Sequence, residues 1–190
     1  NVDLMYGLPH QTVESFSRTL ELVVDKIQPN RTSLFGYAHV PWLKAHQRKI
    51  DEKLLPGPTE RLALFHAGLK AFVGAHYEFI VLDPYAKPDD ELTFARAEGT
   101  LHRNFMGFHT HAGTDMIAFG ITGIGDAQGT YLQNQHKLVR WEQDVAAGHL
   151  PVFRGYVRTE YDLVRGAIIQ ELMCNSRVGR TFLAPDGGDW

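Results

Sequence analysis

Apolar positions near the start of the chain alternate between short continuous runs and a helical spacing. Residues 1–6 form a short apolar run that ends at Gly7-Leu8-Pro9, the pattern of a buried parallel strand followed by a turn. Thr12 can cap a helix, and apolar residues then recur at helical spacing: Val13, Phe16, Leu20, Val23, Val24 and Ile27. Residues 32–37 are β-branched and aromatic and predict a second strand. Strand, helix and strand in this order predict the βαβ unit of an α/β fold.

The remaining pattern predicts four helices and one further strand. A helix opens at Thr59 and turns five apolar residues inward: Leu62, Phe65, Leu69, Phe72 and Val73. Residues 78–82 indicate a strand, and an acid-rich helix follows Pro88. An amphipathic helix covers residues 135–147, and the capping box Thr159-Glu160-Tyr161-Asp162 opens the last helix.

Composition narrows the class of protein. A chain of 190 residues with 44% hydrophobic and 22% charged residues is typical of a globular domain. The net charge of −3 argues against nucleic acid as a partner, and no apolar run approaches the ~18–20 residues of a membrane span. The single cysteine, Cys174, cannot form an internal disulfide and fits a reducing compartment. We therefore expect a cytoplasmic protein with neither nucleic acid nor a membrane as a partner.

Residues 101–115 have no helical apolar period and carry Arg, Asn, His, Thr and Asp rather than the Lys and Glu of a solvated face. Phe105 and Phe108 interleave with these polar groups, while Gly107 and Gly113 let the backbone turn or approach another group closely. Two interpretations stay open: a loop that faces a ligand, or a capped β-turn with buried aromatic side chains.

Three glycines follow this stretch at positions 120, 123 and 125. Their order, G-x-x-G-x-G, is not the dinucleotide-binding fingerprint, which needs G-x-G-x-x-G between a strand and a helix. We expect them instead to let a strand pass close to a neighbouring segment or to a bound cofactor.

The sequence LHRNFMGF at residues 101–108 resembles a segment of the oxygen-independent coproporphyrinogen III oxidases, radical S-adenosylmethionine enzymes of haem biosynthesis. Six more matches lie in order along nearly the whole chain, at residues 3–9, 37–41, 47–50, 88–92, 131–135 and 172–175. The resemblance implies part of a radical-SAM-type partial (β/α) barrel, with parallel strands, covering helices and the substrate-side segment, over residues 1–134. It implies the start of a helical C-terminal domain, truncated, over residues 135–190.

The resemblance also implies an activity for the parent protein. Members of the family convert two propionates of coproporphyrinogen III to vinyl groups with S-adenosylmethionine and a 4Fe–4S cluster. Such a cluster is held by several closely spaced cysteine thiolates, and Cys174 alone cannot bind it. We therefore expect an internal piece of the enzyme that lacks the cluster-binding half, needs that half as a partner, and is inactive and prone to self-association by itself.

Three residues are candidates for contact with S-adenosylmethionine. Asp3 lies in the first strand near its C-terminal end, where open α/β sheets bind ligands, although an Asp there can also cap the turn. The resemblance implies that Asp3 and the backbone around Ala38 contact the cofactor. It implies that Ile124 packs against it.

Other polar residues are candidates for the substrate side. The resemblance places Arg103, Asn104 and Met106 there, although the family usually has Gln at the position of Met106. The basic stretch of residues 44–53 suits the four carboxylates of coproporphyrinogen, or else forms a solvated helix face.

His109 and His111 would project to the same side of a strand, a spacing that can ligate zinc. A full site needs three or four ligands, and no Cys or second His pair stands nearby in the sequence, so we predict no metal site on this chain. We expect these imidazoles to donate hydrogen bonds to substrate carboxylates or to face water.

One alternative function remains open, a non-catalytic porphyrin- or haem-binding module related to the haem chaperones. Residues 37–39 and 101–104 match the oxidases better than those relatives.

Overall fold

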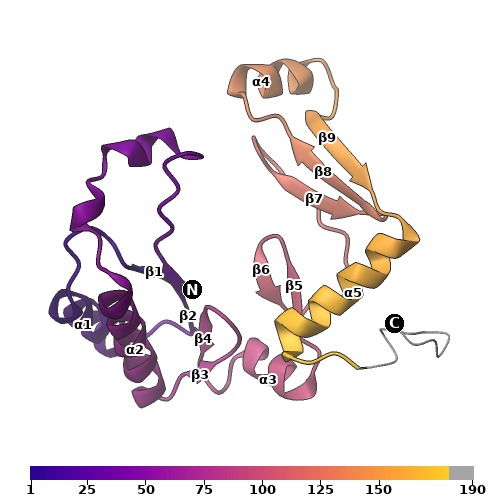
Figure 1. The fold of residues 1–190 in the computed structure, drawn as a ribbon. Coiled ribbons are helices and arrows are strands. Elements are labelled where there is room, and N and C mark those ends of the chain that lie inside the picture. The colour runs from indigo at the N-terminus through magenta and orange to yellow at the C-terminus, as the bar shows by residue number, and fades with distance from the viewer. Residues whose placement is uncertain (180–190) are drawn as a thin grey trace. The chain divides into compact units, whose positions relative to one another are not determined.

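The computed structural model describes residues 1–179 and divides the chain into two compact units, Asn1–Glu98 and the residues from Gly99 onward (Figure 1). Unit 1 is an α/β layer in which helices cover a small sheet. The described part of unit 2 consists of antiparallel strands with two helices. The boundary that we expect after residue 134 lies within unit 2, between a strand and a helix, and stays a prediction.

Unit 1 is built on a four-stranded sheet with the strand order β1-β2-β4-β3. The strands are β1 (Val2–Tyr6), β2 (Arg31–Gly36), β3 (Glu78–Phe79) and β4 (Pro84–Ala86). The helices are α1 (Val13–Glu21), which continues as the π-helical segment η1 (Leu22–Ile27), α2 (Pro58–Gly74) and α3 (Glu91–Glu98), with the 3₁₀ turns η2 (Ala45–Lys49) and η3 (Glu52–Leu54). The pair β1–β2 is parallel, which confirms the predicted strand–helix–strand unit.

The strand predicted at residues 78–82 is shorter than expected. It ends at Phe79, and Leu82 adopts a left-handed conformation with φ of 56°. This turn sends the chain back as β4, which pairs antiparallel with both β2 and β3. The expectation of parallel strands therefore holds for β1 and β2 but not for β4.

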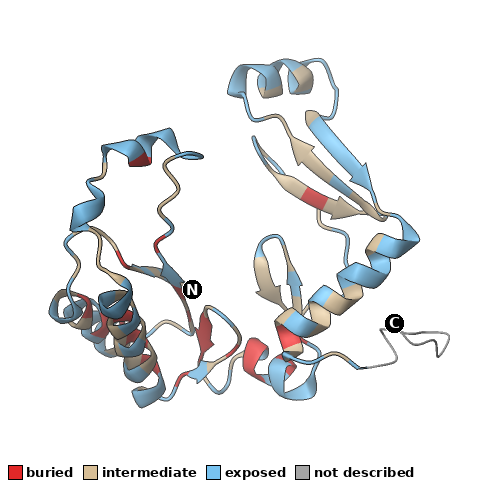
Figure 2. Ribbon diagram, in the orientation of Figure 1, coloured by how far each residue is buried: buried red, intermediate tan, exposed pale blue. Residues whose placement is uncertain are grey.

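The core of unit 1 lies between the sheet and the helices α1 and α2, where most buried residues gather in Figure 2. Phe16 and Leu20 of α1 and Phe72 of α2 are buried against Leu34 and Tyr85 of the sheet. The inward face predicted for α2 is wrong in part, because its buried residues are Leu64, Gly68 and Phe72, whereas Leu62 and Val73 are about half exposed. Apolar residues surround this helix, so their spacing does not single out one face.

Side-chain alternation sets which strand residues meet water. The self-association expected of the isolated chain assumes that the strand residues Leu4, Leu34 and Phe35 meet water. This assumption is wrong for two of them, because Leu34 is 3% exposed and Leu4 packs against the core. Met5 and Phe35, one position further along each strand, are 44% and 37% exposed. Successive side chains point to opposite faces of a sheet, so a shift of one residue exchanges the covered and open faces.

Up to residue 179, unit 2 contains a hairpin, a three-stranded sheet and two helices. The strands are β5 (His102–Asn104), β6 (Gly107–His109), β7 (Ile124–Ala127), β8 (Thr130–Asn134) and β9 (Val152–Val157), and the helices are α4 (Leu138–Ala146) and α5 (Glu160–Asn175). All strand pairs here are antiparallel. Gly125 passes close to a neighbouring segment as expected, since a Cβ there would lie 2.9 Å from the Met116 carbonyl oxygen.

Two predicted helix caps are present. The Thr12 Oγ1 accepts a hydrogen bond from the Ser15 N–H, and the Thr159 Oγ1 accepts one from the Asp162 N–H. Each cap satisfies a backbone donor that the first helical turn leaves without a partner. None of the helices in residues 1–179 is long and apolar enough to cross a membrane.

Candidate functional site

Asp3 lies on the open face of the sheet in unit 1. It is exposed, its strand neighbour is Ser33, and its Oδ1 accepts a hydrogen bond of 2.6 Å from the Asn1 side-chain amide. The turn after β1 is held by a different residue, since the Gly7 and Leu8 N–H groups both donate to the Gln11 Oε1. The structure therefore does not show Asp3 capping this turn, and its carboxylate is exposed on this face.

The backbone around Ala38 is held in place by Gln47. The Gln47 Nε2 donates to the Ala38 carbonyl oxygen at 3.0 Å, and its Oε1 accepts from the Val40 N–H at 2.6 Å. Gln47 is 8% exposed, although the sequence places it in a basic stretch expected to face substrate or solvent. The motif match at residues 47–50 includes Gln47, but nothing in the sequence indicates that it holds this backbone.

The stretch from residue 101 is a β-hairpin in which β5 and β6 are joined at Phe105 and Met106. The Asn104 Oδ1 accepts a hydrogen bond of 2.8 Å from the Met106 N–H and so caps the turn. This agrees with the cap in the interpretation of the stretch as a capped β-turn. The buried aromatic side chain of that interpretation is not found at the tip, where Phe105 is 68% exposed and its neighbour Met106 is 79% exposed. The Arg103 guanidinium lies 5.5 Å from the centre of the Phe108 ring.

Two adjoining cavities in unit 2 are both lined by Arg103 and Asn104 of this hairpin. The first, called here the apolar chamber, measures about 430 Å³, and its lining includes Ile124, Phe105, Met116 and Met173. The second, called here the polar chamber, measures about 380 Å³, and its lining includes His102, His109, His111 and Asp115. Both chambers are also lined by the same seven residues: Arg103, Asn104, Met116, Asp126, Tyr131, Gly166 and Gln170.

Three of the six predicted site residues therefore meet at one place. Ile124, Arg103 and Asn104 line the apolar chamber together, although Ile124 comes from a different sheet. Met106 is outside both linings, at the exposed tip of the hairpin. Asp3 and Ala38 belong to unit 1.

An ion pair joins Asp126, which lines both chambers, to Arg158, which lines the polar chamber. The Arg158 Nη2 is 2.6 Å from the Asp126 Oδ1, and the guanidinium lies 4.7 Å from the centre of the Tyr131 ring. Neither side chain is fully buried, with exposed fractions of 21% for Arg158 and 30% for Asp126. The pair neutralises Asp126, and the Tyr131 ring holds the cation by a second contact.

The histidines of the polar chamber are close to one another but do not form a metal site. Ring centres are 6.2 Å apart for His102 and His109, and 6.4 Å apart for His109 and His111. Burial lowers the pKa of His109, and the neighbouring imidazoles lower it further by disfavouring another positive charge. In residues 1–179, no group of three or more His, Cys, Asp or Glu side chains is placed to hold a metal ion.

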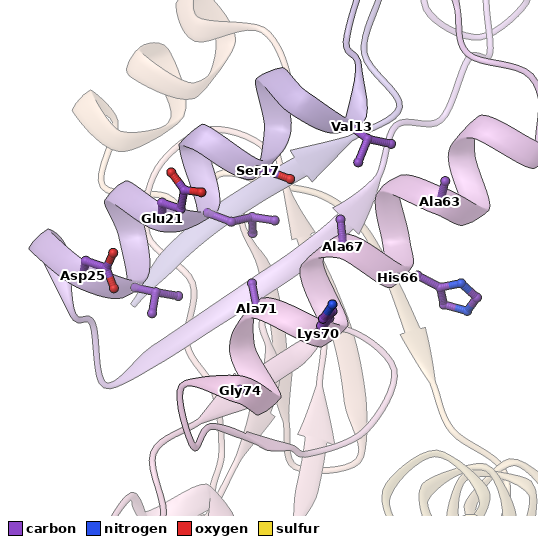
Figure 3. Close-up of a pocket in the computed structure, with 12 residues that line it drawn as sticks. Val13, Ser17, Glu21, Asp25, Ala63, His66, Ala67, Lys70, Ala71 and Gly74 are labelled. Carbon is purple, nitrogen blue, oxygen red and sulfur yellow. The ribbon is translucent and has the colours of Figure 1, made fainter.

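A third hollow, of about 630 Å³, lies between α1 and α2 in unit 1 (Figure 3). Small side chains of α2 face it, including Ala67 and Ala71, and charged side chains such as Glu21, Asp25 and Lys70 stand at its margin. It contains none of the predicted site residues.

Comparison with known proteins gives one consistent result. An oxygen-independent coproporphyrinogen III oxidase of Helicobacter pylori is 42% identical over 178 residues, which cover 94% of this chain and 39% of the relative. The enzymes of that name from Escherichia coli and Thermostichus vulcanus are 41% and 40% identical, over 39% and 57% of their lengths. The solved structure of the Escherichia coli coproporphyrinogen III oxidase, a radical S-adenosylmethionine enzyme, matches with a TM-score of 0.90 at 39% identity. The match covers 97% of this chain and 42% of the Escherichia coli chain.

This chain is homologous to part of an oxygen-independent coproporphyrinogen III oxidase. The resemblance seen in the sequence motifs is confirmed, and it extends over nearly all of the chain. The chain spans about two fifths of the length of the first relatives. No family model matches it.

Proposed function

We propose that this chain is the portion of an oxygen-independent coproporphyrinogen III oxidase that contacts S-adenosylmethionine and coproporphyrinogen III. The observation that carries the proposal is that Ile124, Arg103 and Asn104 line the apolar chamber together. The family resemblance implies that Ile124 contacts the cofactor and that Arg103 and Asn104 lie on the substrate side. The identity of more than 40% with the Helicobacter pylori oxidase supports it.

The 4Fe–4S cluster does not fit the residues of this chain. Such clusters need several thiolates, and Cys174 is a single, buried cysteine whose pKa is raised by burial. We infer that the cluster ligands come from the cluster-binding half of the enzyme, which acts as the partner of this chain. By itself the chain is therefore catalytically inactive.

The residues fit S-adenosylmethionine better. Asp3 is an exposed carboxylate that can accept hydrogen bonds from a hydroxyl or ammonium group, and Ile124 offers apolar contact. The peptide groups beside Ala38 are fixed by Gln47 and can present a backbone contact without further ordering. When bound, the cofactor supplies the group that removes hydrogen from the substrate.

The chain's own task is to bind and orient the porphyrinogen. Each propionate loses carbon dioxide, one hydrogen atom and one electron as it becomes a vinyl group, so the reacting carbon must be held close to the cofactor. Arg103 is exposed at the hairpin and can pair with a substrate carboxylate, while Asn104 fixes the turn beside it.

A chimera tests this function. The matching portion of the Helicobacter pylori oxidase is replaced by this chain, and Arg103→Gln is compared with Arg140→Gln, an exposed arginine on α4 that lines neither chamber. Arg103→Gln should raise the KM for coproporphyrinogen III by about tenfold, since a charge-assisted hydrogen bond contributes ~1.5–3 kcal/mol, whereas Arg140→Gln should not. Equal KM values for the two variants would show that Arg103 does not bind the substrate.

A further inference from the structure

Strand β5 has a partner strand on one edge only. Its neighbour β6 pairs with it through the register His102↔His109, Arg103↔Phe108 and Asn104↔Gly107, and within residues 1–179 no strand pairs with its other edge. Backbone groups of successive residues in a strand point to opposite edges, so every second residue of β5 needs another partner.

Gln170 of α5 supplies that partner. With its side-chain amide oriented so that donors meet acceptors, the Nε2 donates to the Arg103 carbonyl oxygen at 3.0 Å, and the Oε1 accepts from the Arg103 N–H at 2.7 Å. One side-chain amide thus forms the two hydrogen bonds that a neighbouring strand would otherwise form with this residue. Gln170 lines both chambers, beside the strand that carries Arg103 and Asn104.

The same amide also determines which ring nitrogen of neutral His102 carries the proton. Its Oε1 accepts from the His102 Nδ1 at 3.0 Å, so in the neutral ring the proton is on Nδ1 and the lone pair is on Nε2. His109 has the opposite arrangement, because its Nδ1 accepts a hydrogen bond of 3.1 Å from the His111 N–H. Its proton is therefore on Nε2.

The two imidazoles face the same chamber. His102 and His109 are opposite each other across the hairpin, and side chains of such a pair lie on one face. Their ring centres are 6.2 Å apart, and both rings line the polar chamber. Of these two lining residues, His102 thus has an acceptor at Nε2 and His109 a donor at Nε2.

We propose that Gln170 is a positioning residue that holds the Arg103 backbone in β5 and keeps His102 as the Nδ1–H tautomer. The polar chamber would then suit a ligand with a hydrogen-bond donor for His102 next to an acceptor for His109. A residue that only packs α5 against the hairpin would stabilise unit 2 without determining which nitrogen of His102 carries the proton. The inference concerns the chain itself and does not depend on the oxidase activity.

The test uses the whole chain with ¹⁵N-labelled histidine at pH 8, where the tautomers of His102 and His109 are read from nitrogen–proton correlations. His102→Gln identifies the His102 signal. The native chain should show the Nδ1–H tautomer for His102 and the Nε2–H tautomer for His109. Gln170→Leu should move His102 toward the Nε2–H tautomer and leave His109 unchanged. The Arg103 amide should then exchange about tenfold faster, as expected for the loss of one hydrogen bond.

Gln170→Glu separates positioning from packing. Its carboxylate still accepts from the His102 Nδ1–H and the Arg103 N–H, but it cannot donate to the Arg103 carbonyl, so the Nδ1–H tautomer should persist. Gln143→Leu, at an exposed position of α4, is the matched control and should change neither readout. An Nε2–H tautomer of His102 in the native chain overturns the proposal. So does an unchanged tautomer in Gln170→Leu, and if that variant does not fold, loss of the Nδ1–H tautomer in Gln170→Glu overturns it.

Discussion

Gly68 and Gly74 lie on the same helix, α2, and replacing each with alanine separates helix propensity from core packing. A Cβ at Gly68 would lie 2.5 Å from the Leu34 Cδ2, whereas a Cβ at Gly74 would have no atom within 4 Å. Leu34 is 3% exposed and has little room to move aside, because it packs within the core between the sheet and the helices.

The two effects on stability have opposite signs. Alanine in place of glycine favours a helix by up to about 1 kcal/mol at either site, and somewhat less for Gly74 at the helix end. Overpacking a core costs ~1–3 kcal/mol, and only Gly68→Ala meets this cost. We therefore expect Gly68→Ala to be less stable than Gly74→Ala by about 1–3 kcal/mol, which corresponds to roughly 2–12 °C in Tm for a chain of this size.

Urea unfolding followed by circular dichroism measures the difference. The double variant Gly68→Ala with Leu34→Ala provides room for the new methyl group. Its loss of stability should therefore be smaller than the sum of the losses in the two single variants. Equal midpoints for Gly68→Ala and Gly74→Ala would refute the reasoning, since Leu34 would then adapt without cost.

Four further predictions concern the site and the surfaces. In the chimeric oxidase, Asp3→Asn should weaken S-adenosylmethionine binding about tenfold or more by calorimetry, for the loss of a charge-assisted hydrogen bond, with Tm within a few degrees of the parent. Thr159→Ala should destabilise unit 2 by about 1 kcal/mol in urea unfolding, because it removes the cap of α5. Phe35→Ser should reduce self-association of the chain at micromolar concentration in sedimentation experiments, because Phe35 is exposed on the open sheet face. The lowered pKa of His109 predicts an NMR titration midpoint below 6.5. Its contribution to stability is present above pH 6.5 and is lost as the pH falls through the folded-state pKa, and His109→Gln should abolish this dependence.

Local features of the sequence predicted the local structure well. Thr12 and Thr159 cap helices because a cap depends on residues only three apart, and the strand–helix–strand unit follows from apolar spacing within some 35 residues. The inward face of α2 is predicted only in part, because a helix with apolar residues all round gives no single direction. The reversal at Leu82 was missed because a left-handed Leu is rare and has no signal in the pattern.

The site shows the same division between local and long-range information. The motif at residues 101–108 pointed to Arg103 and Asn104, and the structure places them beside Ile124 in one cavity. The motif match at residues 47–50 includes Gln47 but does not indicate its role, and no pattern points to Gln170. Each acts by binding backbone groups that are distant in the chain or determined only by the fold. Met106 remains at an exposed tip, outside both chambers, and its role in place of the usual Gln stays a prediction.

The most direct test of the proposed function compares this chain alone with the chimeric oxidase. Both proteins are reconstituted anaerobically with iron and sulfide and supplied with S-adenosylmethionine, a reductant and coproporphyrinogen III, and both 5′-deoxyadenosine and the divinyl product are measured. We expect both products from the chimera and neither from the chain alone, which has one cysteine. Turnover by the chain alone above a no-protein control, or a chimera that holds its cluster but forms no divinyl product, would contradict the proposal.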